Sequence, residues 1–296
     1  MSVVGQVMVL FLLMLCGLLA AKARWIKEEG IQGLNQVLVN FSLPSLIVGK
    51  LQRDAAPGLM PQLFSVFWMA GASILLCGLI GWLVFWREQP ARRAVFTGMV
   101  MFSNAGFMGF PVLMAAYGEE NLIYGVIYVA IFNVLCWSVG ILLFDRKALS
   151  AKKILAIPSL TASILGIVLF AAGIRLPAMI REALELMGGT TTPLAMFIVG
   201  TRLSRLQASD LKDWKLLLAC GLRLAVLPAL VYFLTGLAGA SGMVRTAVTL
   251  CTAMPCAAVQ VIQAETYHGD AALASRGVAL STALSVVTIP LMLMLL

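Results

Sequence analysis

The sequence predicts an all-α integral membrane protein of ten transmembrane helices, arranged as a 5+5 inverted repeat. Three observations predict this class. Of the 296 residues, 61% are hydrophobic and only 11% are charged, and a soluble domain of this size cannot bury so much apolar surface. The apolar residues form ten separate runs. The two halves of the chain also match one another at one fixed offset.

Each of the ten runs is long enough to cross a bilayer, because a helical span takes about 20 apolar residues. In chain order the runs cover residues 3–22, 31–50, 61–85, 92–117, 121–143, 154–173, 177–201, 214–237, 244–267 and 273–295. They are continuous rather than alternating, which favours helices over an outer-membrane barrel. The connections are short, so no separate soluble domain is expected.

The positions of the basic residues predict the orientation. If the N-terminus lies outside, fifteen Lys and Arg fall in inward loops and five in outward loops. The positive-inside rule therefore predicts a multi-pass protein of the bacterial cytoplasmic (inner) membrane with both termini outside, in the periplasm. The formal charge of +8 is explained by this asymmetry against an anionic leaflet, so no nucleic-acid partner is expected.

A shift of 151 positions superposes three pairs of segments without gaps. PSLIVGKL (44–51) falls on AMFIVGTR (195–202), MFSNAGF (101–107) on TAMPCAA (252–258), and AAYGEENL (115–122) on TYHGDAAL (266–273). The predicted halves are residues 1–148 and 149–296, with five spans each. Because five is odd, the second half enters the membrane from the opposite side, as in many secondary transporters. The alternative is chance similarity between apolar helices.

The fourth and ninth spans contain residues that weaken a helix. Gly106, Gly109 and Pro111 stand in the fourth span, and Pro255 stands at the equivalent place in the ninth. Glycine costs a helix interior about 1 kcal/mol and proline about 3 kcal/mol, and a broken span persists only where it lines protein or a watery cavity. Two broken helices would present free N–H groups to a carboxylate and free carbonyls to a cation. The alternative is a packing kink in which the glycines let another helix come close.

The side chains near these two places are polar but neutral, and they can orient a ligand without the cost of a buried charge. Together with the weakening residues they form the predicted substrate-binding set: Ser103, Asn104, Gly106, Gly109, Pro111, Thr252, Pro255, Gln260 and Gln263.

Three charged or titratable residues are candidates for charge or proton coupling. Arg223 lies about 13 Å into its span and is expected to face the bundle interior, either attracting an anionic substrate or pairing with a carboxylate or with carbonyls freed by Pro228. Glu265 and His268 are predicted to share a helix face. If buried, they could couple transport to protons; alternatively, they reach water near the cytoplasmic end.

Three segments carry a resemblance to a known family. SNAGFMGFPVLMAAYG in the fourth span, AMPCAAVQVIQAETYHGD in the ninth and TPLAMFIVGTRL in the seventh are similar to segments of the auxin efflux carrier family and its bacterial relatives. The resemblance implies that helices 4 and 9 are unwound and cross. It also implies a scaffold of helices 1, 2, 6 and 7, a transport domain of helices 3–5 and 8–10 that moves like an elevator, and a homodimer. Family members carry organic anions, auxin in plants and small carboxylates in some bacterial relatives.

The chain departs from the plant carriers at two places. Its central loop (144–153) is about ten residues long, and Asn104 rather than a proline stands at the first crossing. The substrate is therefore not inferred from auxin. The predicted function is secondary transport of a small organic anion, a carboxylate, across the cytoplasmic membrane by an elevator-like alternating-access mechanism, with a passive channel or facilitator for a small polar solute as the alternative.

No enzyme motif is present, and the six cysteines lack metal-ligand spacing. No cofactor or metal is expected, while coupling to H⁺ or Na⁺ stays open.

Overall fold

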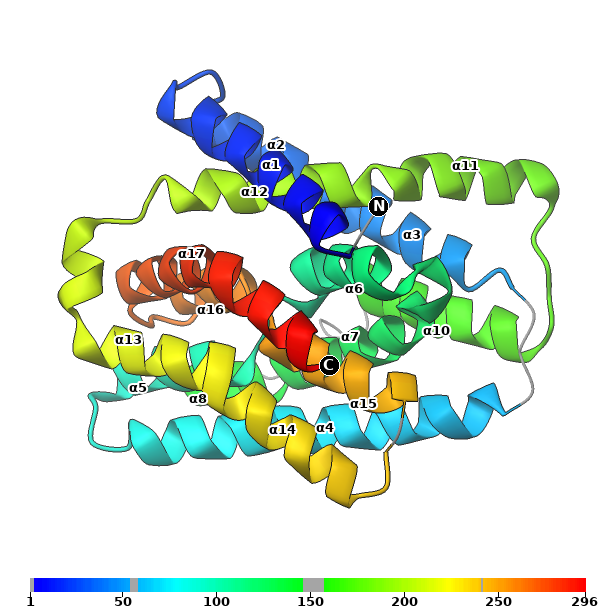
Figure 1. Ribbon diagram of the computed structural model, residues 1–296. Coiled ribbons are helices and arrows are strands. Elements are labelled where there is room, and N and C mark those ends of the chain that lie inside the picture. The colour runs from blue at the N-terminus through cyan, green and yellow to red at the C-terminus, as the bar shows by residue number, and fades with distance from the viewer. Residues whose placement is uncertain (1–2, 54–57, 146–156, 241) are drawn as a thin grey trace.

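The computed structural model describes residues 3–53, 58–145, 157–240 and 242–296, and nearly all of them are helical (Figure 1). The first part of the chain forms α1 (Val3–Lys22), α2 (Glu28–Val37), η1 (Leu38–Ser42), α3 (Leu43–Lys50), α4 (Leu59–Val84), α5 (Pro90–Met101), η2 (Ala105–Gly109), α6 (Phe110–Tyr117), η3 (Glu119–Asn121), α7 (Leu122–Cys136) and α8 (Val139–Phe144). The second part forms α10 (Pro158–Ala171), α11 (Ala178–Gly189), α12 (Thr191–Leu203), η4 (Ala208–Lys212), α13 (Trp214–Gly221), η5 (Leu222–Val226), α14 (Leu227–Leu237), α15 (Gly242–Ala253), α16 (Val259–Thr266) and α17 (Ala271–Leu295).

Six helical stretches within the described residues are long and apolar enough to cross a membrane: Glu28–Lys50, Leu59–Val84, Glu119–Phe144, Ala178–Leu203, Trp214–Leu237 and Ala271–Leu295. They coincide with six of the ten predicted spans. The first and sixth predicted spans contain the shorter apolar helices Met8–Lys22 and Pro158–Ala171, and the fourth and ninth are interrupted. Most of the predicted central loop, and the predicted boundary between the halves at 148/149, lie outside the described residues. The chain is thus a multi-pass, all-α membrane protein.

Three prolines lie inside continuous helical stretches and do not end them. Pro44, Pro111 and Pro228 each stand at the second residue of an α-helix, directly after a π-helical segment: η1, η2 and η5 respectively. Proline lacks an N–H and its ring collides with the carbonyl four residues earlier. The wider π-turn moves that carbonyl away, so the helix can continue past the proline.

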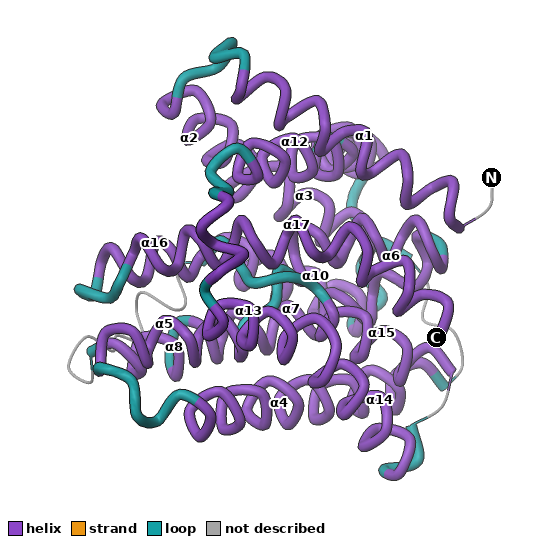
Figure 2. Tube along the Cα trace, turned by 60° about the vertical axis from the view of Figure 1, so that its left-hand side comes forward, coloured by secondary structure: helices purple, strands orange, loops and turns teal. Residues whose placement is uncertain are grey.

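The helices form two groups (Figures 1 and 2). In the first, α1 packs along α12, and α10 and α11 pack against α3. In the second, α4 packs against α5 and α7, while α14 packs against α15. Figure 2 shows α1, α2 and α12 on one side of the molecule and α4 and α14 on the opposite side. The interrupted segments lie between these two sides, where α6 contacts α1 and η2 contacts α12.

Candidate functional site

The two interruptions lie against each other at one point. Helix α5 ends at Met101 and helix resumes at Ala105, whereas α15 ends at Ala253 and α16 begins at Val259. The intervening residues, 102–104 and 254–258, are here called the crossover. They pair in antiparallel fashion: the Asn104 N–H donates to the Pro255 carbonyl at 2.7 Å, and the Ala257 N–H donates to the Phe102 carbonyl at 3.0 Å. Each break thereby satisfies part of the backbone of the other, which an isolated broken span in lipid could not do.

The breaks are displaced from some of the residues predicted to cause them. Pro255 lies inside its gap, as expected, but Gly106, Gly109 and Pro111 belong to the resumed helix, in η2 and α6. The first gap instead ends at Asn104, whose backbone has φ −77° and ψ 52°. The expectation that these three residues form the first break is therefore wrong. The π-turn accommodates Pro111 within the helix, and the extended segment lies earlier in the chain, directly after Met101.

Gly109 has a packing role at the crossover. A Cβ atom placed on it would lie 3.3 Å from the Met254 side chain of the other interrupted segment. A Cβ on Gly106 would meet nothing nearer than Val129 at 4.0 Å. The two glycines therefore differ. Gly109 lets the two crossing segments approach each other, whereas Gly106 leaves space beside the start of η2.

Arg223 joins the ends of the two helices that stop at the crossover. Its side chain is 1% exposed, and Nη1 donates to the carbonyls of Val100 at 2.7 Å and Met101 at 3.3 Å. Nη2 donates to the carbonyl of Thr252. These carbonyls belong to the last turns of α5 and α15, where no helical N–H is left to reach them. Arg223 bonds backbone carbonyls, but the expectation that Pro228 frees these carbonyls is wrong, because they come from the ends of α5 and α15.

The helices that begin at the crossover leave four amides without a backbone acceptor among the described residues. These are the N–H groups of Gly106 and Phe107 at the start of η2, and of Ala258 and Val259 at the start of α16. The same four residues are half-buried, whereas all their neighbours over 94–113 and 246–260 are buried. The free amides therefore lie at the only accessible points of these two stretches, and a helix N-terminus there favours an anion.

Polar side chains surround the crossover. The Ser103 hydroxyl is buried without a hydrogen-bond partner in the described structure. The Asn104 side chain is 7% exposed and forms no hydrogen bond with the described residues. The Thr252 hydroxyl lies 3.2 Å from the hydroxyl of Tyr128 on α7. Ser103 and Asn104 thus keep hydrogen-bonding capacity for a further group, and Thr252 shares its capacity with Tyr128.

Gln260 and Gln263 form a buried pair on α16. Gln260 Nε2 donates to Gln263 Oε1 at 3.0 Å, and Gln263 Nε2 donates to the Cys136 carbonyl at 2.7 Å. Gln260 Oε1 is left without a partner among the described residues and points at Gly98 of α5, where a Cβ atom would overlap it. The structure therefore brings both glutamines to the crossover but engages Gln263 in packing the second helix group.

Substituting Gly98 by alanine tests this fit. The added methyl group has to displace the Gln260 amide, and such overpacking costs about 1–3 kcal/mol. We expect a lower melting temperature for Gly98→Ala and recovery in the double variant Gly98→Ala/Gln260→Ala, which removes the opposing side chain. Gly33→Ala is the control, since nothing lies within 4 Å of its new methyl group. Equal destabilisation of the single and double variants would contradict the fit.

Glu265 and His268 do not share a helix face. Helix α16 ends at Thr266, and His268 has φ 57°, so the chain has already turned away when it reaches the imidazole. Both side chains are exposed. The expectation of a common helix face is therefore wrong, and the exposure agrees with the alternative of two groups that reach the surface.

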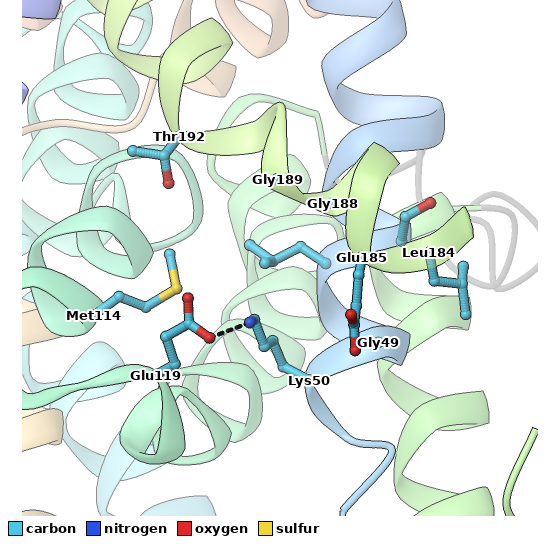
Figure 3. A pocket seen from close by; sticks show the side chains of 11 residues that line it. Gly49, Lys50, Met114, Glu119, Leu184, Glu185, Gly188, Gly189 and Thr192 are labelled. Atoms are coloured by element: carbon cyan, nitrogen blue, oxygen red, sulfur yellow. Dashed lines mark hydrogen bonds and ion pairs between the residues drawn. The ribbon is translucent and has the colours of Figure 1, made fainter. Parts of the chain in front are cut away.

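A separate hollow of about 230 Å³ lies between the first helix group and the α6–η3 segment (Figure 3). It is lined by the C-terminal end of α3, by α11 and the start of α12, and by Met114 of α6. Lys50 at its rim forms an ion pair with Glu119 of η3, drawn as a dashed line in Figure 3. Met114 stands nine residues after Ala105, so the hollow is about 13 Å along η2 and α6 from the crossover.

Two residues that contribute to the crossover were not expected from the sequence pattern. Tyr128 lies in a uniformly apolar run, and Gly98 precedes the recognisable motif by several residues. A glycine inside a span is the signal that could have marked Gly98, because a close approach is the usual reason for its presence. Nothing in the sequence distinguishes Tyr128 from other buried aromatic residues.

Comparison with known proteins points to transport. Residues 2–293 match the family described as Membrane transport protein. An uncharacterized transporter of Methanocaldococcus jannaschii is 24% identical, with 96% of each chain aligned. An uncharacterized transporter of Methanothermobacter thermautotrophicus is 28% identical over 89% of this chain and 88% of its own. The uncharacterized transporter YfdV of Escherichia coli strain K12 is 22% identical over 68% of both chains.

Proposed function

Because this chain belongs to the membrane transport protein family, which includes the auxin efflux carriers, we propose that it is a secondary transporter of a small organic anion, a carboxylate, across the cytoplasmic membrane. The substrate binds at the crossover, on the side where η2 and α16 begin. Transport proceeds by alternating access, in which the second helix group moves against the first like an elevator.

One observation carries the choice of an anion. Two helix N-termini with four unpartnered amides lie at the half-buried points of two otherwise buried segments. Each N-terminus carries roughly half a positive elementary charge, and Arg223 offsets the negative C-terminal ends of the two helices that stop at the crossover. Arg223 forms no ion pair within the described part of the chain, and the only acidic side chain there that is fully buried, Asp210, pairs with Arg276. The electrostatic field at the crossover therefore favours a carboxylate over a cation.

The proposed architecture follows the internal repeat. Residues 1–148 and 149–296 form five-helix halves of opposite orientation, and the crossover joins their equivalent interrupted helices. The first helix group, with predicted helices 1, 2, 6 and 7, serves as the scaffold of a homodimer, and the second group carries the substrate. Both termini lie on the periplasmic side, and surrounding lipid covers the outer apolar side chains.

The proposed function is tested by counterflow of labelled carboxylates into proteoliposomes. We expect saturable uptake of at least one small mono- or dicarboxylate. Asn104→Ala and Gln260→Ala each remove one polar group at the site, and because such a group is worth about 1 kcal/mol, each should weaken apparent affinity about fivefold to tenfold.

Gln62→Ala supplies the matched control, because among the described residues this exposed amide bonds only to Tyr124, at the start of α7. Flux that rises linearly with substrate concentration would indicate a channel instead. Wild-type affinity and rate in both crossover variants across the whole panel would rule out the assigned site.

A further inference from the structure

Carbonyl oxygens surround the Arg223 side chain in the way that they surround a bound metal cation, and the positively charged guanidinium takes the place of the cation. Three carbonyl oxygens from the last turns of two helices converge on one guanidinium group. In transporters with broken helices, the C-terminal ends of half-helices commonly hold the coupling cation. We propose that the Arg223 guanidinium occupies the place of a mobile coupling cation, so that the carrier works without Na⁺ and a shortened side chain turns this place into a binding site for a free monovalent cation.

The charges balance without any added ion. Helices α5 and α15 have 12 residues each, and each contributes roughly −0.5 elementary charge at its C-terminal end. One guanidinium, which carries a single positive charge, neutralises both ends. A Na⁺ ion added beside it would introduce an uncompensated charge into a buried place, which is strongly unfavourable.

The shape of the side chain suits the task. The planar guanidinium presents several N–H donors in a fixed fork, so Nη1 can serve α5 while Nη2 serves α15. The other titratable side chains that it influences are Cys77 of α4, Tyr128 of α7 and Cys256 of the crossover, and thiols and phenols are uncharged at neutral pH. No neighbouring group in the described structure therefore competes with the carbonyls for this cation.

The inference rests on the proposed function for its statement about flux, but its binding half can be tested alone. Purified wild-type protein and Arg223→Ala are melted in detergent at constant ionic strength, with choline, Na⁺ or low-millimolar guanidinium as the cation. Ligand that fills the space left by Arg223 stabilises only the folded state. We expect guanidinium, and more weakly Na⁺, to raise the melting temperature of Arg223→Ala by about 3–6 °C, and to shift the wild type by less than about 1 °C.

The second measurement is carboxylate flux in proteoliposomes in Na⁺ or choline media. Wild-type flux should agree within about twofold between the media, and Arg223→Ala should lose about tenfold or more in choline and regain part of it with guanidinium. Arg181→Ala, which alters an exposed arginine of α11, is the control and should behave as the wild type in every medium.

The outcomes separate the two claims. Wild-type flux that requires Na⁺, or a melting temperature of Arg223→Ala that no cation changes, overturns the inference. Absence of carboxylate flux in every medium, together with a guanidinium-dependent rise in the melting temperature of Arg223→Ala, would remove the proposed substrate class and leave the cation site standing. If Arg223→Ala cannot be purified, Arg223→Ser takes its place: its short uncharged side chain leaves the same space, so guanidinium should still stabilise it, and the absence of that effect counts against the inference.

Discussion

Replacing Arg223 by methionine is expected to lower the free energy of unfolding by about 3–5 kcal/mol, because each buried carbonyl left without a donor costs about 1–3 kcal/mol. Methionine keeps much of the side-chain volume, so the loss arises from the carbonyls of Val100, Met101 and Thr252, which are left without a donor. The measurement is thermal unfolding of the purified protein in detergent.

Arg223→Lys serves as the comparison variant. Lysine preserves the charge but offers a single compact ammonium in place of a planar fork, so it should restore the contact with one helix end only and melt between the wild type and Arg223→Met. A melting temperature of Arg223→Met within about 1 °C of the wild type would mean that the two helix ends do not depend on this residue.

Substituting Gly200 by alanine should produce the second large effect, a destabilisation of about 3 kcal/mol, at the upper end of the range for overpacked sites. A methyl group at Gly200 would overlap the backbone carbonyl of Met14 on α1, and one at Gly17 would overlap the carbonyl of Phe197 on α12. Helices α1 and α12 therefore touch through their backbones at two points. Side chains can rotate away from an added methyl group, but a helix backbone has to move as a whole.

The melting temperature and the yield of monodisperse protein measure this effect. Gly221→Ala is the matched control, because nothing lies within 4 Å of its new methyl group and alanine is the better helix former by about 1 kcal/mol. Destabilisation of Gly200→Ala no greater than that of Gly221→Ala would contradict the close backbone contact.

Both predictions concern how the crossover is supported. Arg223 holds the ends of α5 and α15 together from one side, and the contact between α1 and α12 fixes one wall of the first helix group, against which η2 packs. The free amides of Gly106 and Phe107 belong to that same η2 segment. Stability of the fold and the position of the proposed substrate site therefore depend on the same few backbone contacts.

The sequence by itself determined the class of the protein and the approximate position of its helices. Long apolar runs leave few alternatives in a membrane, because a backbone surrounded by lipid has to satisfy its own hydrogen bonds. The same rule, applied to SNAGFMGFP and AMPCAA, was enough to identify the two spans that are interrupted. It also marked Arg223 as buried, since an arginine deep in a span cannot reach water.

The tertiary structure alone decided where the two interrupted spans break and which residues contact the helix ends at the breaks. Local propensity suggested that Pro111 ends a helix, but a π-turn accommodates this proline. The break instead follows Met101, where the other interrupted segment of the chain supplies the hydrogen-bond partners of Asn104 and Phe102. The partners of Arg223 lie 123, 122 and 29 positions away, and Met14, which Gly200 contacts on α1, is farther away still. Contacts of this kind depend on the packing of distant helices, which has no local signature in the order of the residues.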